Sequence, residues 1–267
     1  MICLLGSGQL GTQIVAKQFD DAGINYSLLL IGSHRGRRGR LERALTLPSR
    51  VYGMLNAARF AALPSVSVYK YRKVLEYLRF RRGKQYKNLI AAYAHYTPRA
   101  IEVLRTPDVN HVRTLRVIEE RSFEIGVLAD VAILDENIVN AFRICCLNAH
   151  PAPLPDCRGG GALQNTLFYG LRPAVSVHYV TGGIDEGDIL RTTNLEMEAN
   201  DSFESITLKL AMLGGHELAQ VTKMLSEGRQ LDIIKNTGKL HYWRDCNLHI
   251  QKTADRNLSQ ILRGLRK

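Results

Sequence analysis

The stretch MICLLGSGQLGTQIVAKQFDDAGINYSLLLI, residues 1–31, decides the fold. An apolar run over residues 1–5 predicts a buried strand, and a glycine-rich turn over residues 6–11 follows it directly. Apolar positions then recur with helical spacing over residues 10–22, and the apolar residues 26–31 predict a second strand. Strand, glycine turn, helix and strand in this order are typical of the first unit of a parallel α/β sheet.

The same rhythm returns in the second half of the chain. We predict a helix over residues 112–120, a long helix from Ser202 to a stop at Gly228, and strands over residues 125–128, 144–147, 174–180 and 189–195. The predicted fold class is therefore α/β, with a Rossmann-like, mostly parallel twisted sheet and helices on both of its faces.

One core is predicted over residues 1–231, with two additions to it. Between about residues 45 and 100, aromatic, basic and apolar residues mix with helical spacing, which predicts a basic helical insertion. Residues 232–267 are predicted to form a basic C-terminal extension, in which the pattern indicates no more than a short helix near Leu258.

Bulk features indicate the class of protein. No apolar run approaches the roughly 20 residues of a membrane-spanning helix, and Met1 leads into the first strand without a basic leader or a cleavage site. Five cysteines without a C-x-x-C pair, two of them adjacent at Cys145 and Cys146, predict reduced thiols rather than disulfides or a zinc site. We therefore expect a cytoplasmic protein that holds no metal.

The net charge of +11 is concentrated in two clusters. Five arginines lie within residues 34–43, and eight further Lys or Arg residues accompany a single Glu within residues 70–87. Such clusters favour anionic partners, namely phosphates, folate polyglutamate, nucleic acid or an acidic membrane surface. A solvated basic face explains the same pattern, so charge alone leaves the partner open.

The glycines of the first turn also fit a dinucleotide fingerprint, Gly6-x-Gly8-x-x-Gly11. The second strand is followed by Arg35 and Arg38, which suit the 2′-phosphate of NADP. The same glycines serve any α/β fold whose first loop binds phosphate, or simply make a tight turn. An NADP-dependent oxidoreductase is therefore kept as a distant alternative.

A second constellation begins at CLNAHPAPLPDCRGGGA, residues 146–162. Asn148 and His150 stand two residues apart at the exit of a predicted strand, where alternate side chains face the same way. Asp185 arrives later, in the glycine-rich turn over residues 181–187. Each residue alone is compatible with an ordinary turn, but together they predict a cleft that holds an amide, an imidazole and a carboxylate.

In order and spacing this constellation resembles the formyltetrahydrofolate-dependent formyltransferases. The resemblance rests on N-x-H-P at 148–151, L-P-x-x-R-G at 154–159 and I-D-x-G-D at 184–188, and it extends over roughly residues 1–11, 26–43 and 105–230. It implies a catalytic domain similar to those that formylate phosphoribosylglycinamide, methionyl-tRNA or amino sugars, with 10-formyltetrahydrofolate as co-substrate. Cys157 departs from the family's pattern, which has an aromatic residue there.

The resemblance also implies catalytic roles. Formyl transfer passes through a tetrahedral oxyanion, which Asn148 and His150 are suited to stabilise as hydrogen-bond donors. Asp185 is suited to accept the proton that the amine loses and to orient the imidazole. His178, by contrast, is expected to be a structural strand residue.

Two sets of binding residues follow from the same resemblance. The expected cofactor-binding residues are Leu128, Ala129, Asp130, Ile133, Leu134, Gly182, Gly183 and Ile184. The expected substrate-binding residues are Gly8, Gln9, Arg35, Pro151, Arg158 and Gly159.

The acceptor is expected to be a small, anionic amine, either a nucleotide-linked amino sugar or a related phosphorylated amine. Roughly 35 residues follow Leu231, fewer than a further domain of ordinary size needs, which disfavours the C-terminal barrel of the tRNA enzymes. Phosphoribosylglycinamide and methionyl-tRNA stay open as acceptors, and a non-catalytic nucleic-acid-binding protein stays open as a rival class. The sequence leaves the oligomeric state open, a dimer included.

Overall fold

The computed structural model describes residues 1–32, 93, 96–237, 241–243 and 248–265. The predicted insertion over residues 45–100 therefore lies almost entirely outside the described residues. Arg35 and the two basic clusters lie outside them as well.

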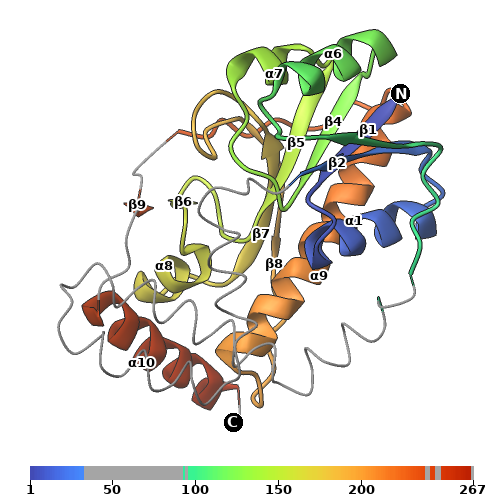
Figure 1. The fold of residues 1–267 in the computed structure, drawn as a ribbon. Helices are drawn as coiled ribbons and strands as arrows, with labels where there is room; N and C mark the ends of the chain where they lie inside the picture. The colour runs from blue at the N-terminus through green and yellow to red at the C-terminus, as the bar shows by residue number, and fades with distance from the viewer. Residues whose placement is uncertain (33–92, 94–95, 238–240, 244–247, 266–267) are drawn as a thin grey trace, which may run out of the picture.

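Within the described ranges, seven strands form one sheet in the order β3-β2-β1-β4-β5-β7-β8 (Figure 1). The strands are β1 (Ile2–Gly6), β2 (Tyr26–Ile31), β3 (Val103–Thr106), β4 (Ile125–Ala129), β5 (Cys145–His150), β7 (Ala174–Tyr179) and β8 (Ile189–Asn194). The first five in chain order run parallel to one another, whereas β7 is antiparallel to β5 and β8 is antiparallel to β7. The predicted Rossmann-like, mostly parallel α/β fold is confirmed.

Successive side chains of a strand point to opposite faces of the sheet. Helices cover both faces, so the strand side chains are buried on either side. The helices of the described chain are α1 (Leu10–Asp21), α6 (Val112–Arg121), α7 (Glu136–Asn140), α8 (Ala162–Phe168), α9 (Phe203–Ser226) and α10 (Leu248–Gly264). Leu4 of β1 packs with Phe19 of α1 on one face, and Leu5 packs with Ile118 of α6 on the other.

The long helix α9 packs against α1, β5 and β7. A capping box starts it: the Ser205 N–H donates to Ser202 Oγ (3.1 Å), and the Ser202 N–H donates to Ser205 Oγ (2.8 Å). This start confirms the prediction made from Ser202. At the middle of the helix, a Cβ on Gly215 would lie 2.7 Å from Ile14 Cγ2, so the missing side chain lets α9 approach α1 closely.

Strand β5 is longer than its sequence pattern predicts. The apolar run predicts an end at Leu147, but the strand continues through Asn148 to His150. The cause is its neighbour β7, which pairs with it up to His150 opposite Ser176. The two polar residues are therefore held by a sheet ladder rather than placed in the loop that follows it.

The C-terminal segment contains more regular structure than predicted. In place of a short helix near Leu258, α10 spans 17 residues. Ala254 and Leu258 join Leu163 and Leu167 of α8 in one apolar cluster. The short strand β9 (His241–Trp243) pairs in parallel with β6 (Cys157–Gly159) in a second, two-stranded sheet. The segment thus packs against α8 and β6, which follow β5 in the chain.

Candidate active site

The cleft begins at β5, whose register sets two side chains toward it. Asn148 and His150 face the same side of the sheet, since one residue separates them in a strand. The antiparallel ladder with β7 places Asn148 directly opposite His178 and His150 opposite Ser176. His150 and His178 are buried, and Asn148 is half-buried. An amide and two imidazoles therefore meet on one side of the sheet.

Asp185 reaches the same place from the loop between β7 and β8. Its Oδ2 lies 3.3 Å from His150 Nδ1 and accepts a hydrogen bond from the Gly159 N–H at 2.8 Å. Its Oδ1 lies 3.6 Å from His178 Nε2. The carboxylate thus stands between the two imidazoles, and the structure brings together Asn148, His150 and Asp185.

The surroundings of Asp185 and His150 decide which of these two side chains carries a charge. Burial alone would raise the pKa of Asp185, but the neighbouring imidazoles of His178 and His150 and the Gly159 N–H outweigh it and lower this pKa to about 2. Burial lowers the pKa of His150, although the charge of Asp185 opposes the shift. Near neutral pH the carboxyl group is therefore ionised, and the buried imidazole favours its neutral form.

His150 is held between two acceptors. Its Nδ1 faces the Asp185 carboxylate, and its Nε2 lies 3.1 Å from the Cys157 carbonyl oxygen. A neutral imidazole carries one N–H and can donate to one of them, whereas an imidazolium donates to both. When the ring takes up a proton, both contacts become hydrogen bonds. This gain stabilises the imidazolium, so His150 can hold a proton transiently.

His178 has a larger part in the cleft than its sequence position indicates. Its Nδ1 lies 2.7 Å from the Tyr179 carbonyl oxygen, so this nitrogen carries the proton and donates. Its Nε2 then accepts from Asn148 Nδ2 at 3.2 Å. The contact fixes the orientation of the amide and leaves its second N–H free to face a ligand. No sequence motif marks this contact, because it depends on the register between β5 and β7.

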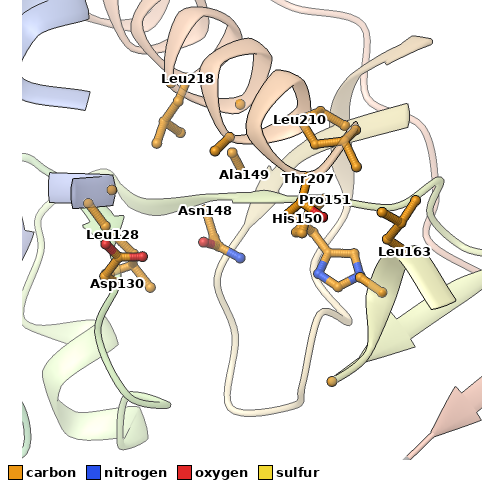
Figure 2. A pocket seen from close by; sticks show the side chains of 18 of the residues that line it. Leu128, Asp130, Asn148, Ala149, His150, Pro151, Leu163, Thr207, Leu210 and Leu218 are labelled. Carbon is orange, nitrogen blue, oxygen red and sulfur yellow. The ribbon is translucent and has the colours of Figure 1, made fainter. Parts of the chain in front are cut away.

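Two cavities meet at these residues. The first, of about 630 Å³, lies between the sheet and α9, and Figure 2 shows Asn148 and His150 on one side of it and Leu210 and Leu218 of α9 on the other. The second, of about 530 Å³, is lined by the segment after β4 and by the Asp185 loop. The residues that line both are Leu128, Asp130, Val131, Asn148, Gly159 and Gly160. Asn148 therefore belongs to the wall that the two cavities share.

The expected cofactor-binding residues gather mainly around the second cavity. Its lining includes Leu128, Asp130, Ile133, Leu134, Gly183 and Ile184. Ala129 lines the first cavity instead, and Gly182 lines neither of the two.

Only some of the expected substrate-binding residues line a cavity. Pro151 and Gly159 line the first cavity, whereas Gly8 and Gln9 line neither; Gly11, from the same turn, lines the first. Arg158 is buried, and its guanidinium is directed at Asn236 rather than into either cavity.

The glycine turn after β1 has a packing role. A Cβ at Gly11 would lie 2.2 Å from Asp130 Oδ2, and a Cβ at Gly6 would lie 2.2 Å from Thr12 Cγ2. The absence of side chains thus admits a carboxylate beside the first turn of α1. A dinucleotide pyrophosphate at this helix terminus would meet that negative charge, which argues against the NADP alternative.

Neither metal nor thiol chemistry is indicated by the described residues. Among them, no three His, Cys, Asp or Glu side chains are grouped so as to hold a metal ion. Burial raises the pKa of the Cys157 thiol to about 11, so this thiol stays protonated near neutral pH. Within the described ranges, no helix has both the length and the apolar character that crossing a bilayer requires.

Part of the chain is similar to a known protein family. Residues 91–222 match the family model described as formyl transferase. Methionyl-tRNA formyltransferase of Ehrlichia ruminantium (strain Welgevonden) is 27% identical over 165 residues, which are 60% of this chain and 51% of that protein. The homologue from Wolbachia sp. subsp. Drosophila simulans (strain wRi) is 32% identical over 111 residues, 41% of this chain and 36% of that protein. The chain thus spans about half the length, or less, of these curated relatives.

Solved structures share the fold at low sequence identity. A sugar N-formyltransferase from Shewanella sp. superposes with a TM-score of 0.55 at 10% identity, over 96% of this chain and 86% of that one. An N-formyltransferase from Helicobacter canadensis, solved with folinic acid and dTDP-3-aminofucose, gives a TM-score of 0.53 at 10% identity, over 97% and 80% of the two chains.

Proposed function

Residues 91–222 match the formyl transferase family model, and on this premise we propose that the chain transfers a formyl group from 10-formyltetrahydrofolate to a primary amine. The proposed acceptor is a small phosphorylated or nucleotide-linked amino sugar. The observation that carries the proposal is the meeting of Asn148, His150 and Asp185 beside a wall that two cavities share.

The two cavities suit two reactants. The second cavity suits the folate, because aliphatic side chains of Leu128, Ile133, Leu134 and Ile184 flank it and can cover a flat ring. The first cavity suits the acceptor, whose amine would approach the shared wall. This arrangement supports direct transfer between two molecules bound at the same time, in which orientation supplies much of the rate.

The catalytic roles follow from what each group can donate or accept. In the transfer, the amine nitrogen bonds to the formyl carbon, the bond from that carbon to N10 breaks, the amine loses a proton and N10 gains one. The second N–H of the Asn148 amide stabilises the developing oxyanion. His150 takes up the proton of the amine, directly or through water, and the ionised Asp185 stabilises the imidazolium that results.

The choice of acceptor rests on the comparisons together with the chain's charge. One structural neighbour is described as a sugar N-formyltransferase and another was solved with dTDP-3-aminofucose; both match nearly the whole chain, which favours an amino sugar. The expected phosphate-binding residue Arg35 stays a prediction. Methionyl-tRNA is the second candidate, favoured by the curated relatives that match in sequence and by the net charge of +11.

A transfer assay with a labelled formyl group tests the proposal. The full chain is incubated with 10-formyltetrahydrofolate and a panel of nucleotide-linked amino sugars that includes dTDP-3-aminofucose; methionyl-tRNA and phosphoribosylglycinamide serve as further acceptors. We expect label in an amino-sugar product, and none with the Asp185→Asn variant. Label in the tRNA alone would favour the second candidate, and no transfer to any acceptor would refute the proposal.

A binding measurement separates the rival classes. We expect 5-formyltetrahydrofolate at about 100 times its dissociation constant to stabilise the chain by about 2.7 kcal/mol in thermal unfolding. Stabilisation by NADPH without any response to folates would instead indicate an oxidoreductase. Steeply salt-dependent RNA binding without turnover would indicate a nucleic-acid-binding protein.

A further inference from the structure

Asp185 occupies a backbone conformation that needs support. Its φ is +51°, in the left-handed region that side-chain-bearing residues rarely adopt. The loop around it is also tight: a Cβ at Gly187 would lie 1.8 Å from the Tyr179 carbonyl oxygen. Because such a conformation persists only where its surroundings hold it, the contacts of this loop decide where the carboxylate sits.

One side chain from the C-terminal segment bonds to the loop at two points. Asn236 Nδ2 donates to the carbonyl oxygen of Asp185 at 2.9 Å and to that of Gly187 at 2.8 Å. Asn236 is 6% exposed, so water competes little for these carbonyls. Both hydrogens of one amide group are therefore used to fix the peptide units that follow Asp185 and Gly187.

The other end of Asn236 is fixed as well. The buried guanidinium of Arg158 donates through Nη2 to Asn236 Oδ1 at 2.7 Å and to the Asn236 carbonyl oxygen at 2.5 Å. The next residue, Gly159, donates its N–H to the Asp185 carboxylate. The backbone of β6, the Asn236 side chain and the Asp185 loop are thus linked in a closed ring. Gly159 of β6 holds the Asp185 carboxylate directly, and Arg158 of β6 holds the Asp185 backbone through Asn236.

Neighbours of Asn236 bring the C-terminal segment to this loop. Ile234 and Ile189 exchange backbone hydrogen bonds of 2.9 Å in an isolated antiparallel bridge. Lys235 forms an ion pair with Asp188 at 2.7 Å, but its side chain is 76% exposed, so this pair is screened by solvent. The buried amide of Asn236, rather than the surface ion pair, is the contact that reaches Asp185.

We propose that Asn236 is a positioning residue for formyl transfer, which holds the Asp185 carboxylate beside His150. The inference rests on the proposed function, because it assigns Asn236 a part in the same proton transfer. It extends that function to a residue 51 positions away from Asp185 along the chain.

Two variants test the assignment against a matched control. Asn236→Ala removes every side-chain contact, and Asn236→Asp keeps an acceptor for Arg158 but loses the amide donor to the loop. Lys235→Ala, one residue earlier, removes the exposed ion pair. We expect kcat for formyl transfer to fall by about tenfold to a hundredfold in both Asn236 variants. We expect KM for the folate to stay within about threefold in both, and Lys235→Ala to stay within about twofold of the wild type in kcat.

An activity-independent readout completes the test. The imidazole of His150 is titrated by NMR in the unliganded wild type and in Asn236→Asp. Since the charge of Asp185 raises the pKa of His150 against the effect of burial, withdrawal of the carboxylate should lower that pKa. His178 and the Cys157 carbonyl, which also face the pair, are unchanged by the substitution. If the wild type transfers no formyl group, the proposed function fails while this titration still tests Asn236.

The kinetics and the titration together decide whether Asn236 positions Asp185. Reduced kcat with a lower His150 pKa, in a variant with wild-type near-UV circular dichroism, supports the assignment. Wild-type kcat or an unchanged His150 titration in folded Asn236→Asp overturns it. If Asn236→Ala fails to fold, the Asn236→Asp titration alone decides.

Discussion

Adjacent glycines in α9 offer a matched pair for testing how the first cavity is built. A methyl group added at Gly214 would lie 3.6 Å from the Ala149 Cβ, which is ordinary van der Waals contact. The same methyl group at Gly215 would lie 2.7 Å from Ile14 Cγ2, which is closer than two carbon atoms approach without a shift of the helices. The two substitutions are chemically identical and differ in what the new atom meets.

The magnitude follows from two opposing contributions. Each Gly→Ala change in a helix interior gains about 1 kcal/mol of intrinsic helix propensity, and this gain is common to the pair. Overpacking of a close-packed helix contact costs about 1–3 kcal/mol, and it applies at Gly215 alone. We therefore expect Gly214→Ala to raise the free energy of unfolding by up to about 1 kcal/mol, and Gly215→Ala to lie about 1–3 kcal/mol below it.

Urea unfolding at 25 °C and calorimetric binding measure the two consequences. Gly214→Ala also places a methyl group in the cavity proposed for the acceptor, so we expect weaker acceptor binding and unchanged folate binding. Equal urea midpoints for the two variants, or a higher midpoint for Gly215→Ala, would contradict the packing described here.

Three further predictions concern the polar groups of the cleft. Because the pKa of Asp185 falls from 3.8 to about 2 on folding, ionised Asp185 stabilises the fold by on the order of 2 kcal/mol at pH 7. This stability is present above pH 4 and is lost as the pH falls toward 2. In urea unfolding, Asp185→Asn should therefore be less stable than the wild type at pH 7, and the difference in free energy of unfolding should be smaller at pH 3. The same variant should lose turnover. His178→Phe should lower kcat about tenfold through the freed Asn148 amide, with folate affinity retained in fluorescence titration. Gly187→Ala should displace the Asp185 loop, because its Cβ would meet the Tyr179 carbonyl oxygen, and unchanged turnover in that variant would contradict this account of the loop.

Much of the fold was predictable because its signals are local. The apolar runs at Ile2–Gly6 and Tyr26–Ile31 and the cap at Ser202 each depend on neighbours in the chain. α8 was not predicted because its residues are buried nearly all round, polar ones included, so it has no amphipathic pattern. α10 was underestimated although its apolar residues Ile250, Ala254, Leu258 and Leu262 recur at every fourth position, so this signal was present in the sequence.

The cleft was predictable only in part, for a different reason. The order and spacing of Asn148, His150 and Asp185 indicated the chemistry, but contacts across the sheet decide the partners. His178 becomes a partner of the Asn148 amide only through the antiparallel ladder of β5 with β7. Asn236 reaches the Asp185 loop from a segment that carries no motif at all, so its place depends on tertiary structure alone.

The shared wall between the cavities has a consequence for ligand design. Asn148 and Asp130 border both spaces, so the two proposed reactants would bind next to each other. A single compound that links a pteridine-like ring to an amine-bearing sugar would occupy both spaces, and its second half would bind at the high effective concentration that a short tether confers. For this chain, a bisubstrate inhibitor should therefore bind far more tightly than either fragment.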